Sequence, residues 1–286
     1  MSNDYLLFII SGGLGDAAEL TRALLVASTL GYVVHVMIVL KGQAGKMGDI
    51  WAKMPEFTRV TREQAMNFHY KAVMSATAHS LTSRSTGLRF ERLFSGSSVA
   101  EVGQIVEDKL NLLVELGHSK EKVYGAEKKM RPHLWHLLEE KPRDTVVVAP
   151  GVGGWRRGMD KRYDKWAQVI RLLPRPVAIS GDDKAYEPWM DQFKSDAGVQ
   201  NLIGDDKKLS DVIPLFSRTK VILCPDNGLG HLAGLFGIPT VSVFNGVTNP
   251  KMTAPPEALV IEGMNSTLKP EDIVDQMHRL ISENKA

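Results

Sequence analysis

Short apolar runs alternate with amphipathic segments over much of the chain. The first apolar run, residues 5–10, predicts a buried strand, and residues 32–40 predict a second strand. Between them, residues 16–30 place Leu20, Leu24 and Leu30 near one face of a predicted helix. A strand, a helix and a strand with short connections predict a parallel sheet with a right-handed crossover.

The same alternation returns in the second half of the chain. Strands are predicted at residues 146–149, 177–180, 220–224 and 240–244, and helices at 164–173, 184–193, after Gly228 and at 270–283. The middle is less regular, with weaker strand candidates near Arg59 and at 71–74 and helices at 100–117 and 128–140. The charged residues 139–145, which include Pro142, predict a linker between two domains.

We therefore expect an α/β protein with two Rossmann-like domains, each a parallel sheet with helices on both faces. The predicted domains are residues 1–140 and 146–270, followed by a C-terminal helix over 271–286. Folds of this class bind ligands beyond the carboxyl ends of their strands, so we expect a ligand cleft there.

The composition is that of a globular protein, and it indicates in which cellular compartment the protein functions. The 286 residues are 43% hydrophobic and 24% charged, and the net charge of +2 does not by itself indicate a partner. The single cysteine, Cys224, cannot form an internal disulfide, which favours a reducing compartment. The first apolar run is too short for a secretory signal, and no run approaches the ~18 apolar residues of a membrane span. We expect a soluble, cytoplasmic protein.

The turn after the first predicted strand has two interpretations. Residues 13–18 read G-L-G-D-A-A, which matches the G-x-G-x-x-A phosphate turn with Gly13 and Gly15 in the glycine positions. The second strand, however, ends without the acid that would bind a ribose hydroxyl, although Lys41 leaves an NADP site open. Asp16 would lie where a pyrophosphate approaches. It is either a helix N-cap or a carboxylate placed for proton transfer, and one residue can do both.

A second glycine turn is more specific. Asp226 and Asn227 follow the predicted strand 220–224, Gly228 and Gly230 come next, and a helix begins near His231. Glycines let backbone amides approach a phosphate, and a helix N-terminus carries partial positive charge, so an anion is the natural ligand. The carboxylate of Asp226 is better suited to sugar hydroxyls. An ordinary turn residue at Asp226 and an ordinary first-turn histidine at His231 are the simpler alternatives.

Three segments resemble one family. Residues 226–233 read D-N-G-L-G-H-L-A, which resembles the D-[ST]-G-x-x-H-[LA]-A signature of the heptosyltransferase-like glycosyltransferases of family 9, with Asn227 in the Ser/Thr place. Residues 149–166 are similar to the family's P-G-x-x-W…K-R-W-P segment, with K-R-Y at 161–163. Residues 15–24 resemble its G-D-x-x-x-x-x-P-A-L turn, with Thr21 and Arg22 where proline is usual. The resemblance is strongest in 146–246 and faint in 41–130.

The resemblance implies a GT-B arrangement, in which two Rossmann-like domains face each other and the N-terminal one binds the acceptor. It also implies an inverting transfer from a nucleotide-diphosphate sugar, with Asp16 as the base and Gly13 and Gly15 in the acceptor-side turn. The implied contacts to the donor diphosphate and sugar are Lys161, Arg162, Asp226, Asn227, Gly228, Leu229, Gly230 and His231. The implied contacts to the nucleoside are Ser180, Gly181 and Glu187. The sequence has no D-x-D motif, so we expect no metal and no cofactor.

The charge of the N-terminal half bears on the acceptor. Residues 41–95 hold nine lysines and arginines against four acids, which favours an anionic acceptor. A lipopolysaccharide-type core, with peripheral membrane contact, is the first candidate, and a hydroxymethylated base in DNA is the second. Two other classes stay open: a catalytically inactive nucleotide-sugar binding protein and an NADP oxidoreductase, although the latter offers no reason for residues 226–233.

Overall fold

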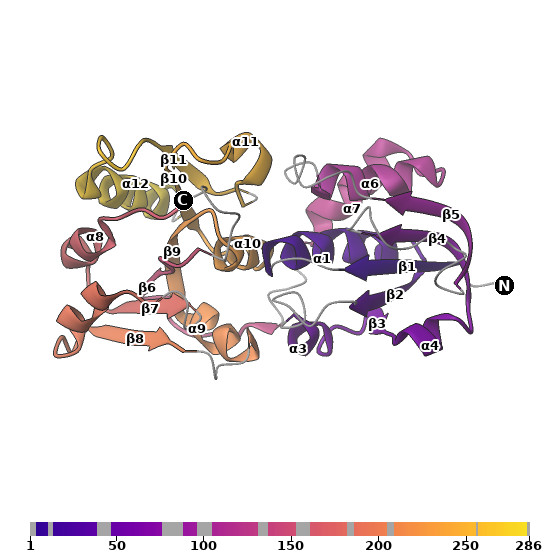
Figure 1. Ribbon diagram of the computed structural model, residues 1–286, viewed down its shortest axis with the longest axis horizontal. Coiled ribbons are helices and arrows are strands. Elements are labelled where there is room, and N and C mark those ends of the chain that lie inside the picture. The colour runs from indigo at the N-terminus through magenta and orange to yellow at the C-terminus, as the bar shows by residue number, and fades with distance from the viewer. Residues whose placement is uncertain are drawn as a thin grey trace. The chain divides into compact units, whose positions relative to one another are not determined.

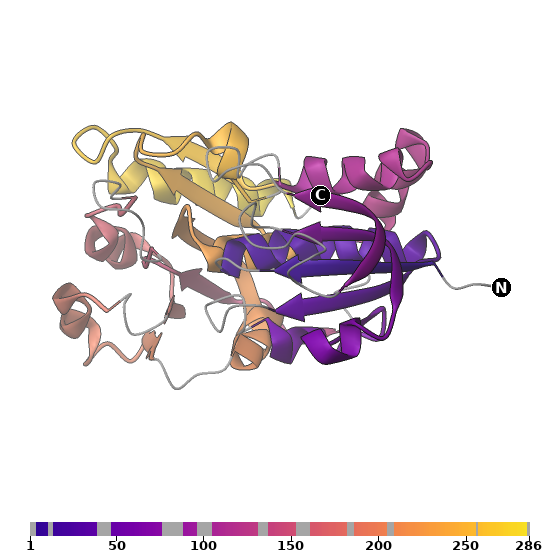
Figure 2. The same ribbon diagram turned by 45° about the vertical axis from the view of Figure 1, so that its right-hand side comes forward.

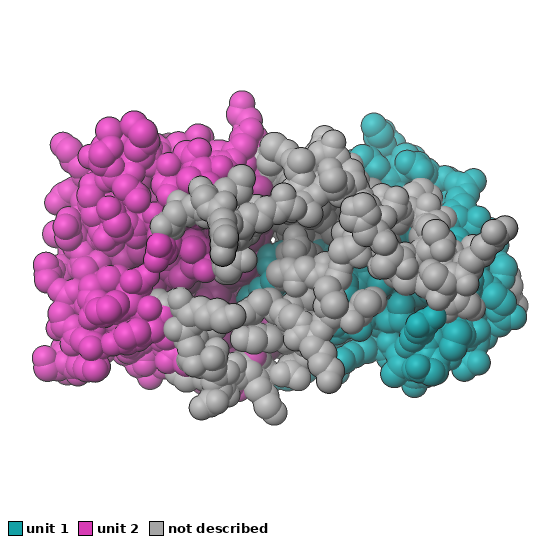
Figure 3. Space-filling view, in the orientation of Figure 1, with its two compact units in different colours: residues 1–134 teal, residues 135–286 magenta. Residues whose placement is uncertain are grey.

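The computed structural model describes residues 4–10, 14–38, 47–75, 88–95, 105–130, 137–152, 161–181, 186–204, 209–255 and 257–284. It divides into two compact units, unit 1 (residues 1–134) and unit 2 (residues 135–286), coloured teal and magenta in Figure 3. Each unit is a parallel sheet with helices, which confirms the predicted α/β fold class. Of the described helices, none has the length and apolar character needed to cross a bilayer.

Unit 1 is built on a five-stranded parallel sheet in the order β3-β2-β1-β4-β5. Its strands are β1 (Tyr5–Ile10), β2 (Val33–Ile38), β3 (Phe57–Arg59), β4 (His69–Ser75) and β5 (Arg89–Ser95). Its helices are α1 (Leu14–Thr29), α3 (Gly48–Trp51), α4 (Arg62–Ala65), α6 (Ile105–Glu115) and α7 (Lys120–Met130). The arrowheads of the strands point the same way in Figure 2, so their carboxyl ends share one edge.

Unit 2 is built on a six-stranded parallel sheet in the order β11-β10-β9-β6-β7-β8 (Figure 1). Its strands are β6 (Thr145–Val148), β7 (Val177–Gly181), β8 (Val199–Ile203), β9 (Thr219–Pro225), β10 (Thr240–Phe244) and β11 (Leu259–Glu262). Its helices are α8 (Trp166–Leu172), α9 (Val212–Arg218), α10 (Gly228–Leu235), α11 (Pro250–Thr253) and α12 (Pro270–Glu283), with 3₁₀ turns η4 (Pro188–Phe193) and η5 (Leu209–Asp211). This is the doubly wound strand order, and its direction reverses between β6 and β9.

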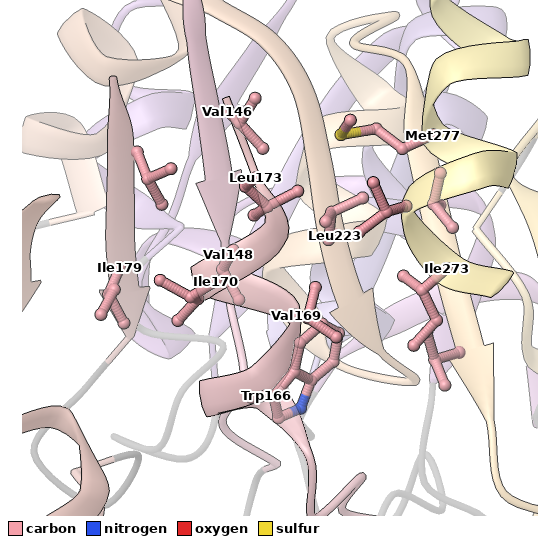
Figure 4. Packing of buried hydrophobic residues seen from close by; sticks show 14 of the residues in the cluster. Val146, Val148, Trp166, Val169, Ile170, Leu173, Ile179, Leu223, Ile273 and Met277 are labelled. Carbon is pink, nitrogen blue, oxygen red and sulfur yellow. The ribbon is translucent and has the colours of Figure 1, made fainter. Parts of the chain in front are cut away.

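The core of unit 2 lies between its sheet and the helices α8 and α12. Figure 4 shows Trp166 and Ile170 of α8 and Ile273 of α12 directed toward Val148 and the neighbouring strand residues. All four side chains are buried. Because a parallel sheet is covered on both faces, its strands read as continuous apolar runs, which is the pattern that predicted them.

Most predicted elements are confirmed, and the differences have local causes. Strands 5–10 and 240–244 and helix 270–283 match their predicted bounds. Of the helix predicted at 128–140, residues 128–130 are the end of helix Lys120–Met130, residues 131–136 lie outside the described residues, and residues 137–140 are not α-helical. The helix predicted at 184–193 is only the 3₁₀ turn η4, which starts at Pro188. Strands β8 and β11 were not predicted, because they are edge strands with half-exposed side chains.

Candidate functional site

The candidate site lies where the strand order of unit 2 reverses, at the carboxyl ends of β6 and β9. Val148 pairs with Leu223, and the Ala149 amide donates to the Leu223 carbonyl at 2.9 Å, so the two strands end side by side. Residues 149–152 and 226–228 therefore leave the sheet next to each other. Doubly wound folds bind ligands in the crevice that this arrangement opens.

Asn227 begins helix α10 and ties it to the segment after β6. Its Oδ1 accepts from the Gly230 amide at 2.9 Å, which caps the helix. Its Nδ2 donates to the carbonyl oxygens of Ala149 and Gly151, both at 2.7 Å. The helix also packs tightly on β9, since a Cβ at Gly230 would lie 2.6 Å from the Cys224 sulfur. That thiol is fully buried, and burial raises its pKa to about 12.

Asp226 is the centre of a buried polar network. Its Oδ2 accepts from Lys161 Nζ at 2.7 Å, from Thr248 Oγ1 at 2.9 Å and from Thr253 Oγ1 at 3.0 Å. Its Oδ1 lies 3.6 Å from Nε2 of His231 on α10. The side chains of Asp226 and Lys161 are each only 6% exposed. The network joins three segments of unit 2 and the first turn of α10 around one carboxylate.

The carboxyl of Asp226 stays ionised in this environment. Burial alone raises the pKa of a carboxyl, because it removes water from the charged form. Here the neighbouring His231 and the Lys161 ammonium outweigh burial and lower the pKa of Asp226 to about 2. The buried lysine and aspartate are therefore an ion pair at neutral pH.

The segment that carries Lys161 is held by the loops after β10 and β11. The Arg162 carbonyl accepts from the side-chain amides of Asn245 and Asn265, both at 3.1 Å. Tyr163 anchors the segment, since its hydroxyl donates to the Leu268 carbonyl at 3.2 Å. These contacts hold residues 161–163 in place although they form no helix or strand.

Of the residues predicted to bind the nucleoside, Glu187 lies beside this segment. Arg162 Nη1 is 3.2 Å from Glu187 Oε1, at the surface of unit 2. Ser180 is buried near the end of β7, and Gly181 is the last residue of that strand. The structure thus brings Arg162 next to Glu187, and Lys161 next to Asp226.

The glycine turn of unit 1 is described in part. Helix α1 begins at Leu14, so Gly15 and Asp16 lie in its first turn, and Asp16 is not the N-cap residue. Gly13 and the side chain of Asp16 lie outside the described residues. The turn follows β1, which pairs with β2 on one side and β4 on the other. It therefore occupies the corresponding reversal point of the unit 1 sheet.

Sequence reasoning missed several residues of this site. The two threonines on Asp226, Thr248 and Thr253, carry no motif, and only the fold brings them to the carboxylate. The amides of Asn245 and Asn265 were missed for the same reason. The pairing of Lys161 with Asp226 was also not predicted, because these two residues are 65 positions apart.

Two doubly wound parallel-sheet units form the fold class of the GT-B glycosyltransferases, which solved heptosyltransferase structures share. A family model described as glycosyltransferase family 9 (heptosyltransferase) matches residues 104–276, and the chain belongs to this family. It is a glycosyltransferase of the heptosyltransferase-like kind.

Solved structures of low sequence identity share the fold over nearly the whole chain. E. coli heptosyltransferase WaaC with ADP is 15% identical, with a TM-score of 0.72 over 96% of this chain and 99% of that one. E. coli ADP-heptose lps heptosyltransferase II is 16% identical, with a TM-score of 0.68 over 99% and 100%. A family 9 glycosyl transferase from Veillonella parvula is 12% identical, with a TM-score of 0.69 over 99% of both chains. Among curated protein sequences, none matches this chain.

Proposed function

We propose that this glycosyltransferase is an inverting, metal-independent enzyme that moves a sugar from a nucleotide-diphosphate sugar to an acceptor hydroxyl. The observation that carries the proposal is the buried Lys161–Asp226 pair beside the capped start of α10. A solved structure titled E. coli heptosyltransferase WaaC with ADP-2-deoxy-2-fluoro heptose, 18% identical, has the same fold, which makes ADP-heptose the first donor to test.

The start of α10 supplies the groups that a departing diphosphate needs. Asn227 occupies the Gly230 amide, and helix geometry provides no intrahelical acceptor for the amides of Gly228 and Leu229. We assign these two amides to the diphosphate, together with the positive end of the helix dipole. Lys161 adds a cation whose position is fixed in advance. Groups already in place stabilise the developing negative charge without having to reorganise.

Asp226 has two proposed roles. Its Oδ2 accepts from Lys161 and from two threonine hydroxyls, so this oxygen fixes the lysine. Its other oxygen faces His231, and we assign it to a hydroxyl of the transferred sugar. A carboxylate with a pKa of about 2 is charged throughout the physiological range and therefore remains an acceptor.

Unit 1 is proposed to supply the base and the acceptor site. Asp16 lies in the first turn of α1, at the carboxyl edge of a parallel sheet, where ligands of this fold class bind. We assign it the proton of the attacking hydroxyl, which it must reach within hydrogen-bond distance. Direct attack on the anomeric carbon by this hydroxyl gives inversion. The fixed cation and helix start take the place that a D-x-D-bound metal would have, and the sequence has no D-x-D motif.

The acceptor is proposed to be anionic, with a lipopolysaccharide-type core as the first candidate. The excess of lysine and arginine in residues 41–95 supports this choice. An acceptor screen tests it with three probes: a phosphorylated glycolipid core, a neutral oligosaccharide and duplex DNA that contains hydroxymethylated bases. A neutral oligosaccharide that is as good an acceptor as the glycolipid would contradict the anionic assignment.

The central experiment measures transfer from ADP-heptose and from UDP-glucose, with release of the nucleoside diphosphate followed by chromatography. We expect activity in excess chelator and a product with inverted anomeric configuration by NMR. Retention of configuration, or chelator-sensitive activity that an added metal restores, would contradict the proposed mechanism. If the folded protein binds no nucleotide sugar and releases no nucleoside diphosphate, the proposed function itself is wrong.

A further inference from the structure

Asn227 joins two backbone segments at the reversal point of the unit 2 sheet. One side of its amide accepts from the Gly230 amide at 2.9 Å, and the other donates to the carbonyls of Ala149 and Gly151 at 2.7 Å. The reverse orientation of the side chain would put the NH₂ group against an N–H donor and the oxygen against two carbonyl oxygens. The contacts therefore allow one orientation, and all three hydrogen bonds depend on it.

A serine or threonine at this position could not make the same set of bonds. Its hydroxyl can accept from Gly230 and so cap the helix, but it has one donor and a shorter reach. It could not hold both the Ala149 and Gly151 carbonyls. The family signature has serine or threonine here, so the double bond to the β6 segment is a property of the asparagine in this chain.

The two carbonyls matter because of where they lie. They belong to the segment that leaves β6 beside the start of α10, and an unengaged carbonyl oxygen next to a diphosphate is repulsive. An ordered backbone also lowers the entropy that binding must remove. Asn227 satisfies both oxygens and holds their segment against the helix that we assign to the diphosphate.

We propose that Asn227 is a positioning residue for donor binding, which fixes residues 149–151 against the first turn of α10 in addition to capping the helix. This inference rests on the proposed function, since it takes the start of α10 as the diphosphate site. It separates two effects of one side chain: a cap that stabilises the helix, and a bridge that prepares the ligand site.

Two variants separate the cap from the bridge. Asn227→Ser keeps a capping oxygen and loses the double bridge, whereas Asn227→Ala loses both. We expect Asn227→Ser to lower the melting temperature less than Asn227→Ala does, while the Kd for ADP, measured by calorimetry, rises about 10-fold. Asn227→Ala should show the same weakening of ADP binding and a lower melting temperature. If Asn227→Ser binds ADP as tightly as the wild type, Asn227 is only a cap and the inference is wrong.

A third variant and a ligand-free measurement complete the test. Asn227→Asp keeps the cap but places a carboxylate against two carbonyls and the diphosphate, so its loss of ADP affinity should exceed that of the serine variant. Hydrogen exchange in the peptide covering residues 146–152 should be faster in Asn227→Ser than in the wild type without ligand, and equal rates would also contradict the bridge. A wild-type protein that binds neither ADP nor UDP would instead refute the proposed function, which keeps the two failures distinct.

Discussion

Replacing Lys161 with methionine tests the buried ion pair, because it removes one charge and leaves the other buried. The substitution removes the cation 2.7 Å from Asp226 Oδ2 and leaves a buried carboxylate with two hydroxyl donors and the neighbouring His231. Removing one partner of a buried pair typically costs about 3–5 kcal/mol, because the remaining charge is left uncompensated. The lowered pKa of Asp226 has the same sign, because His231 and Lys161 together stabilise the buried carboxylate. We expect Lys161→Met to lower the opening free energy of unit 2 by about 3 kcal/mol.

The measurement should report unit 2 alone, since two units need not unfold together. Hydrogen exchange of the α10 and β9 amides gives the local opening free energy. The double variant Lys161→Met with Asp226→Leu removes both charges and should be more stable than the sum of the two single losses predicts. A loss below about 1 kcal/mol in the single variant, or strict additivity in the double variant, would refute the ion-pair reasoning.

The same pair predicts how stability depends on acid. The pKa of Asp226 is lowered in the folded protein, so its contribution is complete above the ordinary value of 3.8 and is lost as the pH falls toward 2. The Lys161→Met variant has less of this contribution to lose. Its opening free energy should therefore change less between pH 4 and pH 2 than that of the wild type, and an equal change would contradict the assignment.

Three further predictions address both units. Asp16→Asn should reduce the rate of transfer by ~100-fold or more and leave donor affinity unchanged. The charge-matched control Glu19→Gln should keep a rate near that of the wild type. If Asp16→Asn keeps a tenth or more of the wild-type rate, Asp16 is not the base. Gly230→Ala should lower the melting temperature of unit 2, because its Cβ would lie 2.6 Å from the Cys224 sulfur, and an unchanged calorimetric transition would show that α10 can shift freely. Burial lowers the pKa of His35, so unit 1 should lose stability as the pH falls below 6.5. In denaturant titrations at pH 7 and pH 5, His35→Gln should lose less stability than the wild type, and an identical pH dependence would contradict this prediction.

The parts of the site that depend on local sequence were predictable. The glycines and the capping residue at 227–230 act on their own backbone, so their spacing alone indicated a helix start at the end of a strand. The central strands were predictable because burial on both faces gives them continuous apolar runs. Edge strands such as β8 lack this pattern, and the short helix η4 is shaped by Pro188 more than by periodicity.

Contacts between residues far apart in the sequence were not predictable from hydrophobic patterns or from motifs. The motifs around Lys161 and Asp226 suggested separate ligand contacts for each, and nothing in their spacing indicated that one would hold the other. Thr248 and Thr253, whose hydroxyls donate to Asp226, lie in the segment after β10. No sequence motif marks these two threonines. Such partners are set by which loops a doubly wound sheet brings to one edge, and this becomes visible only when the strand order is known.

The buried carboxylate in the predicted anion site has a physical reason, because it holds the lysine in place. An isolated lysine at the reversal point would be a mobile cation, and its ordering would oppose ligand binding. Asp226 fixes Lys161 in a pair that is neutral overall, so the attraction for a diphosphate comes from the helix start and from the orientation of the lysine. Asp226 holds the ammonium of Lys161 in one position, and Asn227 holds the carbonyls of Ala149 and Gly151 in one position. Both sets of contacts are formed before a ligand binds. Loss of the carboxylate and loss of the amide should therefore weaken donor binding through different groups, and their effects should be separable in a double-mutant cycle.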